Sequence, residues 1–149
     1  MTTVKQLLQA KSQELWTTRP ETSVFDALQL MADKDVGALP VTTQGTQIIG
    51  ILSERDYARK GILKGKASKN TLVRELMTRE VVYVHPDHSV ERCMALMTRH
   101  KIRHLPVLDD AQSVVGMISM RDVVRALFEN QRETIERLEG RRRADLYDS

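Results

Sequence analysis

The sequence predicts an α/β fold, of mixed α+β type, built from two copies of one small unit. Pro20–Tyr57 aligns without a gap on Pro86–Val123, at a constant offset of 66 residues. In each copy, apolar residues first recur at helical spacing, and two short segments that predict strands follow, the second of them rich in β-branched residues. A chain of 149 residues has room for one compact domain or for two half-sized units that share a core.

The alignment of the two copies is too regular to arise by chance. Most non-identical pairs keep their character, such as Val36 with Ile102. An internal repeat of this kind predicts a repeated structural unit. The identical positions in the first copy are Pro20, Ser23, Val24, Leu30, Met31, Leu39, Pro40, Val41, Gly50, Ser53, Arg55 and Asp56.

The first half of each copy predicts a capped helix followed by two strands. Ser23 and Ser89 are suitable N-cap residues, and Ser23 with Asp26 resembles a capping box. The apolar spacing after each serine predicts a helix. The runs "ALPV" and "HLPV" predict short strands at an edge or a strand start, because each contains a proline. The runs "QIIGIL" and "SVVGMI" predict buried strands.

A second helix is expected to close each copy. It begins at Ser53 in the first copy and runs through Lys60, and it begins at Ser119 in the second and runs to about Glu129 or beyond. With a strand before the proline that opens each copy, the unit reads βαββα. One such unit has too small a core to be stable alone, so we expect the two units to pack together.

The segments outside the repeat are also informative. "VKQLL" from Val4 is echoed by "VRELM" from Val73, at an offset of 69 residues. "KGILKGKASKN" predicts an exposed connection, and the tail is expected to be helical to about Glu139, to break at Gly140 and then to fray. The expected divisions are a first repeat with its basic connecting loop at 1–69, a second repeat at 70–131, and a helical extension with a frayed tail at 132–149.

Composition excludes several classes of protein. The chain has 41% hydrophobic and 29% charged residues, which is typical of a folded protein. No apolar run is long enough to cross a bilayer, and no secretory signal is recognisable, so a cytoplasmic protein is expected. The lone Cys93 cannot form an internal disulfide, which agrees with a reducing compartment.

The motif Gly-x-x-Ser-x-Arg-Asp carries the chemistry of the repeat. It occurs as "GILSERD" at Gly50–Asp56 and as "GMISMRD" at Gly116–Asp122. One interpretation is structural, because Ser-x-x-Asp is a variant of the capping box at a helix start. The other is a nucleotide site: helix amides and serine would bind phosphate, glycine would permit close approach, and aspartate would accept hydrogen bonds from a ribose diol.

These residues resemble a tandem pair of cystathionine-β-synthase (CBS) domains, a Bateman module. The pattern "TRPETSVFDALQLMADKDVGALPV...IIGILSERD", repeated as "VHPDHSVERCMALMTRHKIRHLPV...VVGMISMRD", covers nearly the whole chain. The resemblance implies two halves related by a pseudo-twofold axis and packed through their sheets, with two clefts between them. Members of this family commonly bind AMP, ADP, ATP, S-adenosylmethionine or NAD(H), and catalysis is not expected of the module.

The resemblance also implies residue roles, with Asp56 and Asp122 holding ribose hydroxyls. Arg103 and His104 stand where the first copy has Gly37 and Ala38, so the two sites are expected to be unequal, and which cleft receives the basic pair stays open. The residues expected at phosphate groups are Ser53, Arg55, Ser119, Arg121, Arg103 and His104. The residues expected to line adenine are Thr18, Arg19, Pro20, Gly37, Ala38, Val84, His85 and Pro86.

The sequence thus predicts a non-catalytic adenosine-nucleotide sensor, with AMP as its first ligand and ATP, ADP or NAD(H) as alternatives. It is expected to form a homodimer and to control an unknown protein in trans. No metal is expected, because the histidine pairs lack accompanying cysteines. Binding of nucleic acid through the basic loop and tail is the alternative, but no aromatic platform lies near those charges and the net charge is only +3. An enzyme is not expected, because the sequence contains neither a nucleophile with an adjacent base nor a phosphate-loop signature.

Overall fold

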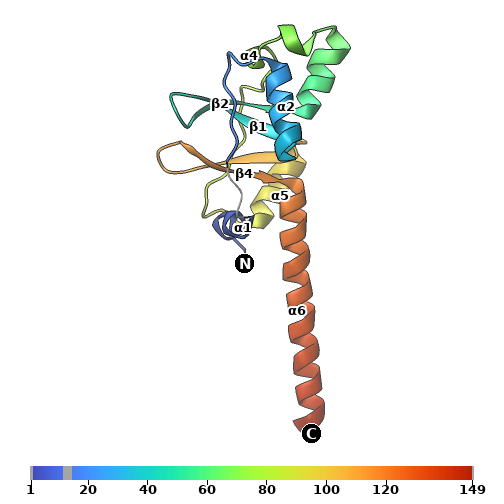
Figure 1. The fold of residues 1–149 in the computed structure, drawn as a ribbon. Helices are drawn as coiled ribbons and strands as arrows, with labels where there is room; N and C mark the ends of the chain where they lie inside the picture. The colour runs from blue at the N-terminus through green and yellow to red at the C-terminus, as the bar shows by residue number, and fades with distance from the viewer. Residues whose placement is uncertain (1, 12–14, 149) are drawn as a thin grey trace.

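The computed structural model describes residues 2–11 and 15–148, and its two halves have the same construction (Figure 1). In the first half, helix α2 (Val24–Lys34) precedes an antiparallel hairpin of β1 (Ala38–Thr43) and β2 (Gln47–Ser53). In the second half, α5 (Val90–His100) precedes an antiparallel hairpin of β3 (His104–Leu108) and β4 (Val114–Ser119). The helix and the two central strands of the predicted unit are therefore confirmed in both copies.

The predicted first strand of each unit is reduced to a single bridge. Thr18 pairs in parallel with Val41, and Val84 pairs in parallel with Val107. Each bridge places a third segment beside the hairpin, as the βαββα reading requires. The two hairpins also meet at their tips, where the amide of Val114 donates to the carbonyl of Thr46 at 3.0 Å.

The same local signals start and end the first helices of the two copies. Ser23 accepts a hydrogen bond from the amide of Asp26, and Ser89 accepts one from the amide of Arg92. Each helix ends at a residue in the left-handed region, Asp35 with φ 53° and Lys101 with φ 54°. A left-handed residue at a helix end is a common C-terminal cap. The capping box predicted for Ser23 and Asp26 is present only in its serine half.

The second helices differ between the copies. In the first copy, α3 (Glu54–Asp56) continues as the π-helical turn η1 (Tyr57–Gly61) and the 3₁₀ turn η2 (Ile62–Lys64), which ends at Gly65. After the short turn η3 (Ser68–Asn70), the chain enters the second half. In the second copy, α6 (Met120–Asp148) is one helix of 29 residues that projects away from the body of the molecule (Figure 1).

The break expected at Gly140 is wrong, because α6 continues through it. A glycine inside a helix costs only about 1 kcal/mol relative to alanine. The residues before it are good helix formers, and Arg132 forms an ion pair with Glu136 one turn along at 3.5 Å. One unfavourable residue therefore does not end the helix.

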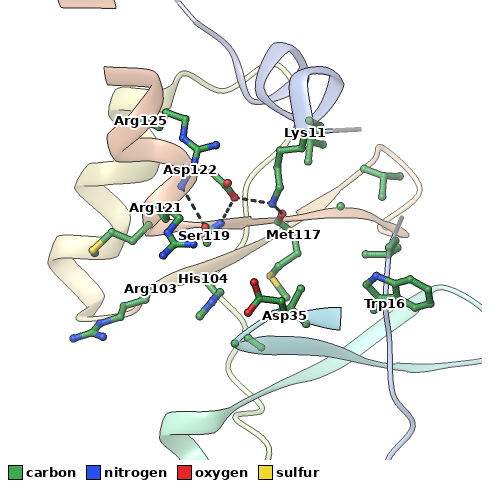
Figure 2. Close-up of a pocket in the computed structure, with 18 residues that line it drawn as sticks. Lys11, Trp16, Asp35, Arg103, His104, Met117, Ser119, Arg121, Asp122 and Arg125 are labelled. Carbon is green, nitrogen blue, oxygen red and sulfur yellow. Dashed lines mark hydrogen bonds and ion pairs between the residues drawn. The ribbon is translucent and has the colours of Figure 1, made fainter. Parts of the chain in front are cut away.

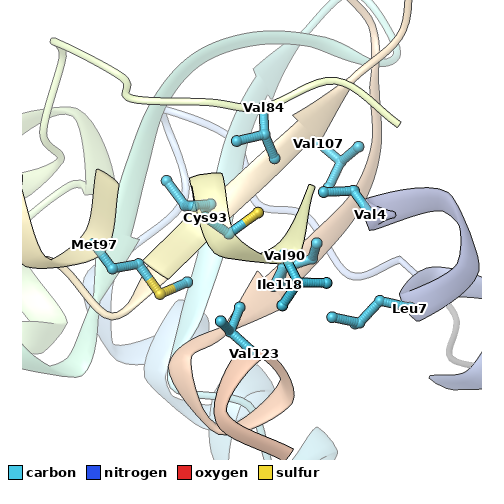
Figure 3. Packing of buried hydrophobic residues seen from close by; sticks show 10 residues of the cluster. Val4, Leu7, Val84, Val90, Cys93, Met97, Val107, Ile118 and Val123 are labelled. Carbon is cyan, nitrogen blue, oxygen red and sulfur yellow. The ribbon is translucent and has the colours of Figure 1, made fainter. Parts of the chain in front are cut away.

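Two short helices exchange places between the halves. Helix α1 (Val4–Lys11) lies at the start of the chain, yet its Val4 and Leu7 are buried in the core of the second half (Figure 3). Helix α4 (Val73–Leu76) follows the connection, yet Val73 and Leu76 are buried in the core of the first half. The echo at an offset of 69 residues therefore marks two matching helices, and each completes the repeat that it does not belong to in sequence. A division at residue 69 does not separate the two cores in space.

The hydrogen bonds of these two helices show the same exchange. In α1, the amide of Val4 donates to the carbonyl of His88, and in α4 the amide of Val73 donates to the carbonyl of Thr22, each at 2.8 Å. The acceptors lie just before α5 and α2. The start of each exchanged helix is thus fixed beside the start of the longer helix in the opposite repeat.

The glycine of the repeated motif makes room for the exchanged helices. A Cβ atom built on Gly116 would lie 2.7 Å from Leu8 in α1, and one on Gly50 would lie 2.7 Å from the sulfur of Met77 just after α4. The Gly50 position is further closed by the carbonyl oxygen of Thr78 at 3.0 Å. Close approach explains both glycines, and the approaching group is protein.

Candidate functional site

Two clefts lie between the halves, and each contains one copy of the Ser-x-Arg-Asp motif. The first has a volume of about 540 Å³ and is named here the Asp122 cleft. It is formed by the end of α1, the segment that follows it, the end of α2 and the β4–α6 junction. Its lining residues are Leu8, Lys11, Leu15, Trp16, Asp35, Val36, Gly37, Ala38, Arg103, His104, Val115, Gly116, Met117, Ser119, Met120, Arg121, Asp122 and Arg125.

The second cleft, the Asp56 cleft, has a volume of about 470 Å³ and is formed by the matching segments. Both volumes are within the usual range for small-molecule sites. Its lining residues are Gly37, Ile51, Ser53, Glu54, Arg55, Asp56, Arg59, Thr78, Glu80, Val82, Lys101, Ile102, Arg103 and His104.

One wall is common to the two clefts. Gly37, Arg103 and His104 line both of them. The basic pair of Arg103 and His104, which the sequence could not assign to one cleft, therefore belongs to both. A Cβ atom on Gly37 would lie 3.2 Å from two ring atoms of His104. The glycine of the first copy therefore makes space for the histidine of the second.

His104 stands in this wall as a neutral side chain at pH 7. Burial lowers its pKa below 6.5, and the positive charges of Lys11 and Arg103 lower the pKa further against the opposing effect of Asp122. At neutral pH the positive charge of the common wall is therefore that of Arg103.

Asp122 is held at the junction of β4 and α6 (Figure 2). Its Oδ2 accepts from the amide of Ser119 at 2.9 Å, and its own amide donates to Oγ of Ser119 at 3.2 Å. The same Oδ2 is 2.6 Å from Nζ of Lys11, which also donates to the carbonyl of Met117. Burial acts to raise the pKa of Asp122, but the hydrogen bonds from Lys11 and Ser119 and the charge of Lys11 outweigh it and lower the pKa. The carboxylate is thus ionised, capped and already ion-paired.

Asp56 has the same cap with a weaker ionic partner. Its Oδ2 accepts from the amide and the hydroxyl of Ser53, each at 3.0 Å. Its Oδ1 lies 3.5 Å from Lys60 and 3.5 Å from the hydroxyl of Thr78. The capping interpretation of the motif is therefore correct in both copies, and a cleft lies beside each cap.

The structure brings eight of the predicted contact residues other than the aspartates to the clefts. The remaining six line neither cleft. Thr18 and Val84 are buried beside the hairpins, and the ring of His85 is 2.9 Å from the carbonyl of Leu108. The residues at the clefts are Ser53, Arg55, Ser119, Arg121, Arg103, His104, Gly37 and Ala38. The residues that line neither cleft are Thr18, Arg19, Pro20, Val84, His85 and Pro86.

Several cleft residues were missed from the sequence, and a signal for them existed. Trp16 and Val82 are matched by the offset of 66 residues and line opposite clefts. Lys11 and Glu80 are matched by the offset of 69 residues and also line opposite clefts. Extending the first alignment toward the N-terminus and the second toward the C-terminus would have found all four.

Other site types have little support in residues 2–11 and 15–148. They contain no group of three or more histidine, cysteine, aspartate and glutamate residues placed to hold a metal ion. Within the same residues, no helix has the length and apolar character needed to span a bilayer. Burial raises the pKa of the Cys93 thiol to about 11, so Cys93 is a core residue with little thiolate character.

Comparisons with known proteins agree with this architecture. The family model of the CBS domain matches residues 4–61 and 73–129. The mitochondrial CBS domain-containing protein CBSX3 of Arabidopsis thaliana is 42% identical over 146 residues, which cover 92% of this chain and 70% of that protein. A putative signal-transduction protein with CBS domains from Burkholderia ambifaria has a solved structure with a TM-score of 0.81 and 47% identity, over 87% of this chain and 96% of that one.

Two further solved structures contain ligands. CBSX2 in complex with AMP has a TM-score of 0.71 and 28% identity, over 88% of this chain and 99% of that one. The CBS domain pair of MJ0100, in complex with 5′-methylthioadenosine and S-adenosyl-L-methionine, has a TM-score of 0.77 and 28% identity, over 88% of this chain and 98% of that one. The two family matches cover most of the sequence, and they coincide with two halves of the same construction. The chain therefore belongs to the CBS-domain family and contains two CBS domains in tandem.

Proposed function

We propose that this protein is a non-catalytic regulatory module that binds adenosine nucleotides in the Asp122 and Asp56 clefts and controls a partner protein. AMP is the first choice of ligand, with ADP, ATP or NAD(H) as alternatives. The complexes of CBSX2 with AMP and of the MJ0100 pair with two adenosine derivatives support this ligand class. The module would report the energy state of the cell through the ratio of these nucleotides.

The observation that carries the proposal is the placement of the two aspartates. Each carboxylate lies at a strand-to-helix junction and lines a cleft. A carboxylate can accept two hydrogen bonds from a vicinal diol, and ribose provides such a diol. Arg55 and Arg121 lie one residue earlier at the start of a helix, where phosphate is favoured by free amides and by positive charge.

The energies are consistent with this division of roles. A hydrogen bond to a charged group contributes about 1.5–3 kcal/mol, so two of them from one aspartate contribute roughly 3–6 kcal/mol. Micromolar affinity requires about 8 kcal/mol. Burial of the base and contacts to phosphate must supply the rest, and Trp16 in the Asp122 cleft offers an aromatic surface for the base.

Asp122→Ala and Asp56→Ala test the proposal directly. Each substitution is expected to weaken AMP binding in its own cleft by about a hundredfold, because both hydrogen bonds to the diol are lost. Isothermal titration calorimetry of the single and double variants measures this. Asp33→Ala, at an exposed position of α2, is the control and should bind like the wild type. Unchanged AMP affinity in the double variant would contradict the proposal.

Regulation would follow from a shift in the population of two arrangements. A ligand that contacts both halves favours the arrangement in which the cleft closes on it, and a partner that binds that arrangement better reads the change. We expect a homodimer and control of another protein in trans. Buried Cys93 suits a reducing compartment such as the cytoplasm, although the Arabidopsis relative is named as mitochondrial.

A further inference from the structure

The two clefts differ in charge at a pair of matched positions. Lys11 ends helix α1 and lines the Asp122 cleft, whereas Glu80 occupies the matching position after α4 and lines the Asp56 cleft. The charge is thus reversed between two positions related by the internal repeat. A second difference is Met120, which stands in the Asp122 cleft where the Asp56 cleft has Glu54.

The arginines of the two clefts do not distinguish them. Arg121 and Arg125 line the Asp122 cleft, and their counterparts Arg55 and Arg59 line the Asp56 cleft. Arg103 belongs to both. Any preference between the clefts for charged ligands must therefore come from the remaining side chains.

Lys11 neutralises the carboxylate that faces the Asp122 cleft. Its Nζ lies 2.6 Å from Oδ2 of Asp122 and 2.9 Å from the carbonyl of Met117. An ammonium group has three donors, so one donor of Lys11 is left for a ligand oxygen. Both side chains are largely buried, with 16% and 12% of their surface exposed, so the pair is screened less than a surface pair.

The Asp56 cleft is more acidic around its carboxylate. Asp56, Glu54 and Glu80 all line it, and the ion pair of Asp56 with Lys60 is longer at 3.5 Å. The side chain of Lys60 is also 42% exposed, so water screens its charge. The matched helix ends oppose this difference, because Asp35 lines the Asp122 cleft and Lys101 lines the Asp56 cleft. Both are exposed, however, so water screens their charges more than it screens the pair of Lys11 and Asp122.

We infer that Lys11 and Glu80 set the ligand class of the two clefts: the Asp122 cleft takes an adenosine ligand with two or more phosphates, and the Asp56 cleft takes one with a single phosphate or none. This inference rests on the proposed function. While Asp122 binds the ribose diol, the third donor of Lys11 can bind an oxygen of the phosphate chain, and the positive charge of Lys11 offsets part of the phosphate charge. A polyphosphate in the Asp56 cleft would instead meet the charge of Glu80, which costs affinity.

The chain offers a cleft-specific probe. Trp16 is the only tryptophan, and it lines the Asp122 cleft alone. Titrations with adenosine, AMP and ATP, followed by Trp16 fluorescence, therefore report affinity in the Asp122 cleft. Calorimetry of the same ligands in an Asp122→Ala background reports the Asp56 cleft.

Reversing each charge should exchange the preferences. Lys11→Glu is expected to weaken the binding of ATP in the Asp122 cleft at least tenfold more than the binding of adenosine, because a charge changes sign beside the phosphates. Glu80→Lys should strengthen the binding of ATP in the Asp56 cleft about tenfold and change the affinity for adenosine by less than about threefold. Lys11→Met, which removes the charge without reversing it, should give a smaller change in the same direction. Lys5→Glu, at an exposed position of α1, is the matched control and should change neither ratio.

The results distinguish failure of the ligand-class assignment from failure of nucleotide binding itself. If adenosine and ATP bind both wild-type clefts with the same preference, or if Lys11→Glu weakens them equally, the assignment of ligand classes is wrong and the nucleotide module remains. If no adenosine ligand binds either wild-type cleft, the proposed function and this inference both fail. Circular dichroism of each variant shows whether a loss of binding reflects unfolding.

Discussion

Leu7→Ala is expected to destabilise the protein by about 2–5 kcal/mol and to loosen the second repeat rather than the first. Leu7 lies in α1 near the start of the chain, and only 6% of its surface is exposed. It packs in the core that contains Val90, Met97 and Ile118 (Figure 3). Truncation leaves a cavity there, and partial relaxation does not recover the lost contacts.

The matched change is Leu76→Ala, and it should loosen the first repeat. Leu76 lies in α4, is 1% exposed, and packs with Met31 and Leu52. Urea denaturation measures the loss of stability in both variants. Hydrogen exchange shows where it falls: faster exchange in β3 and β4 for Leu7→Ala, and in β1 and β2 for Leu76→Ala. The opposite pattern would mean that each short helix supports the repeat it belongs to in sequence.

Local chemistry explains why much of the fold could be predicted. Ser23 and Ser89 mark the helix starts because their hydroxyls accept the free amides of the first turn. The β-branched runs became β2 and β4 because each pairs with the strand just before it through a loop of only a few residues. Each of these signals acts over a short span of sequence. A repeat doubles such signals and makes them easier to recognise.

The exchange of α1 and α4 could not be predicted from local signals. An amphipathic helix specifies which of its faces is buried, and it does not specify which of two similar cores receives that face. The choice depends on the path of the chain through the whole molecule. This choice brings Lys11 to Asp122, so the shorter of the two ion pairs at the motif aspartates joins residues 111 positions apart.

In the candidate site, too, the parts set by local sequence could be predicted and the parts set by the path of the chain could not. The positions of Ser53, Asp56 and their counterparts followed from one motif, because the serine and the aspartate cap the same helix start three residues apart. Of the residues expected at adenine, Gly37 and Ala38 line the Asp122 cleft, whereas Thr18 and Val84 bridge to the hairpins and are buried, and Trp16 and Val82 lie at the clefts two residues earlier. Two residues of extended chain span about 6–7 Å, which is enough to separate a position that lines a cleft from the position where the segment bridges a hairpin.

Gly50→Ala is expected to lower the free energy of unfolding by about 1–3 kcal/mol, because the added methyl group overpacks the contact between β2 and the segment after α4. Its Cβ would lie 2.7 Å from the sulfur of Met77 and 3.0 Å from the carbonyl oxygen of Thr78. The flexible methionine can move, but the carbonyl is fixed, since it accepts a hydrogen bond from the amide of Ile51 at 3.0 Å.

Two other glycines provide the comparison for this change. Gly116→Ala should cost less, because its Cβ would meet only the end of the Leu8 side chain, at 2.7 Å. Gly140→Ala meets nothing within 4 Å in the middle of α6, so it should stabilise that helix by roughly 0.5–1 kcal/mol. Urea denaturation should therefore rank the variants with Gly50→Ala the least stable and Gly140→Ala the most. If Gly50→Ala were as stable as the wild type, close packing of the exchanged helix would not be the reason for glycine in the motif.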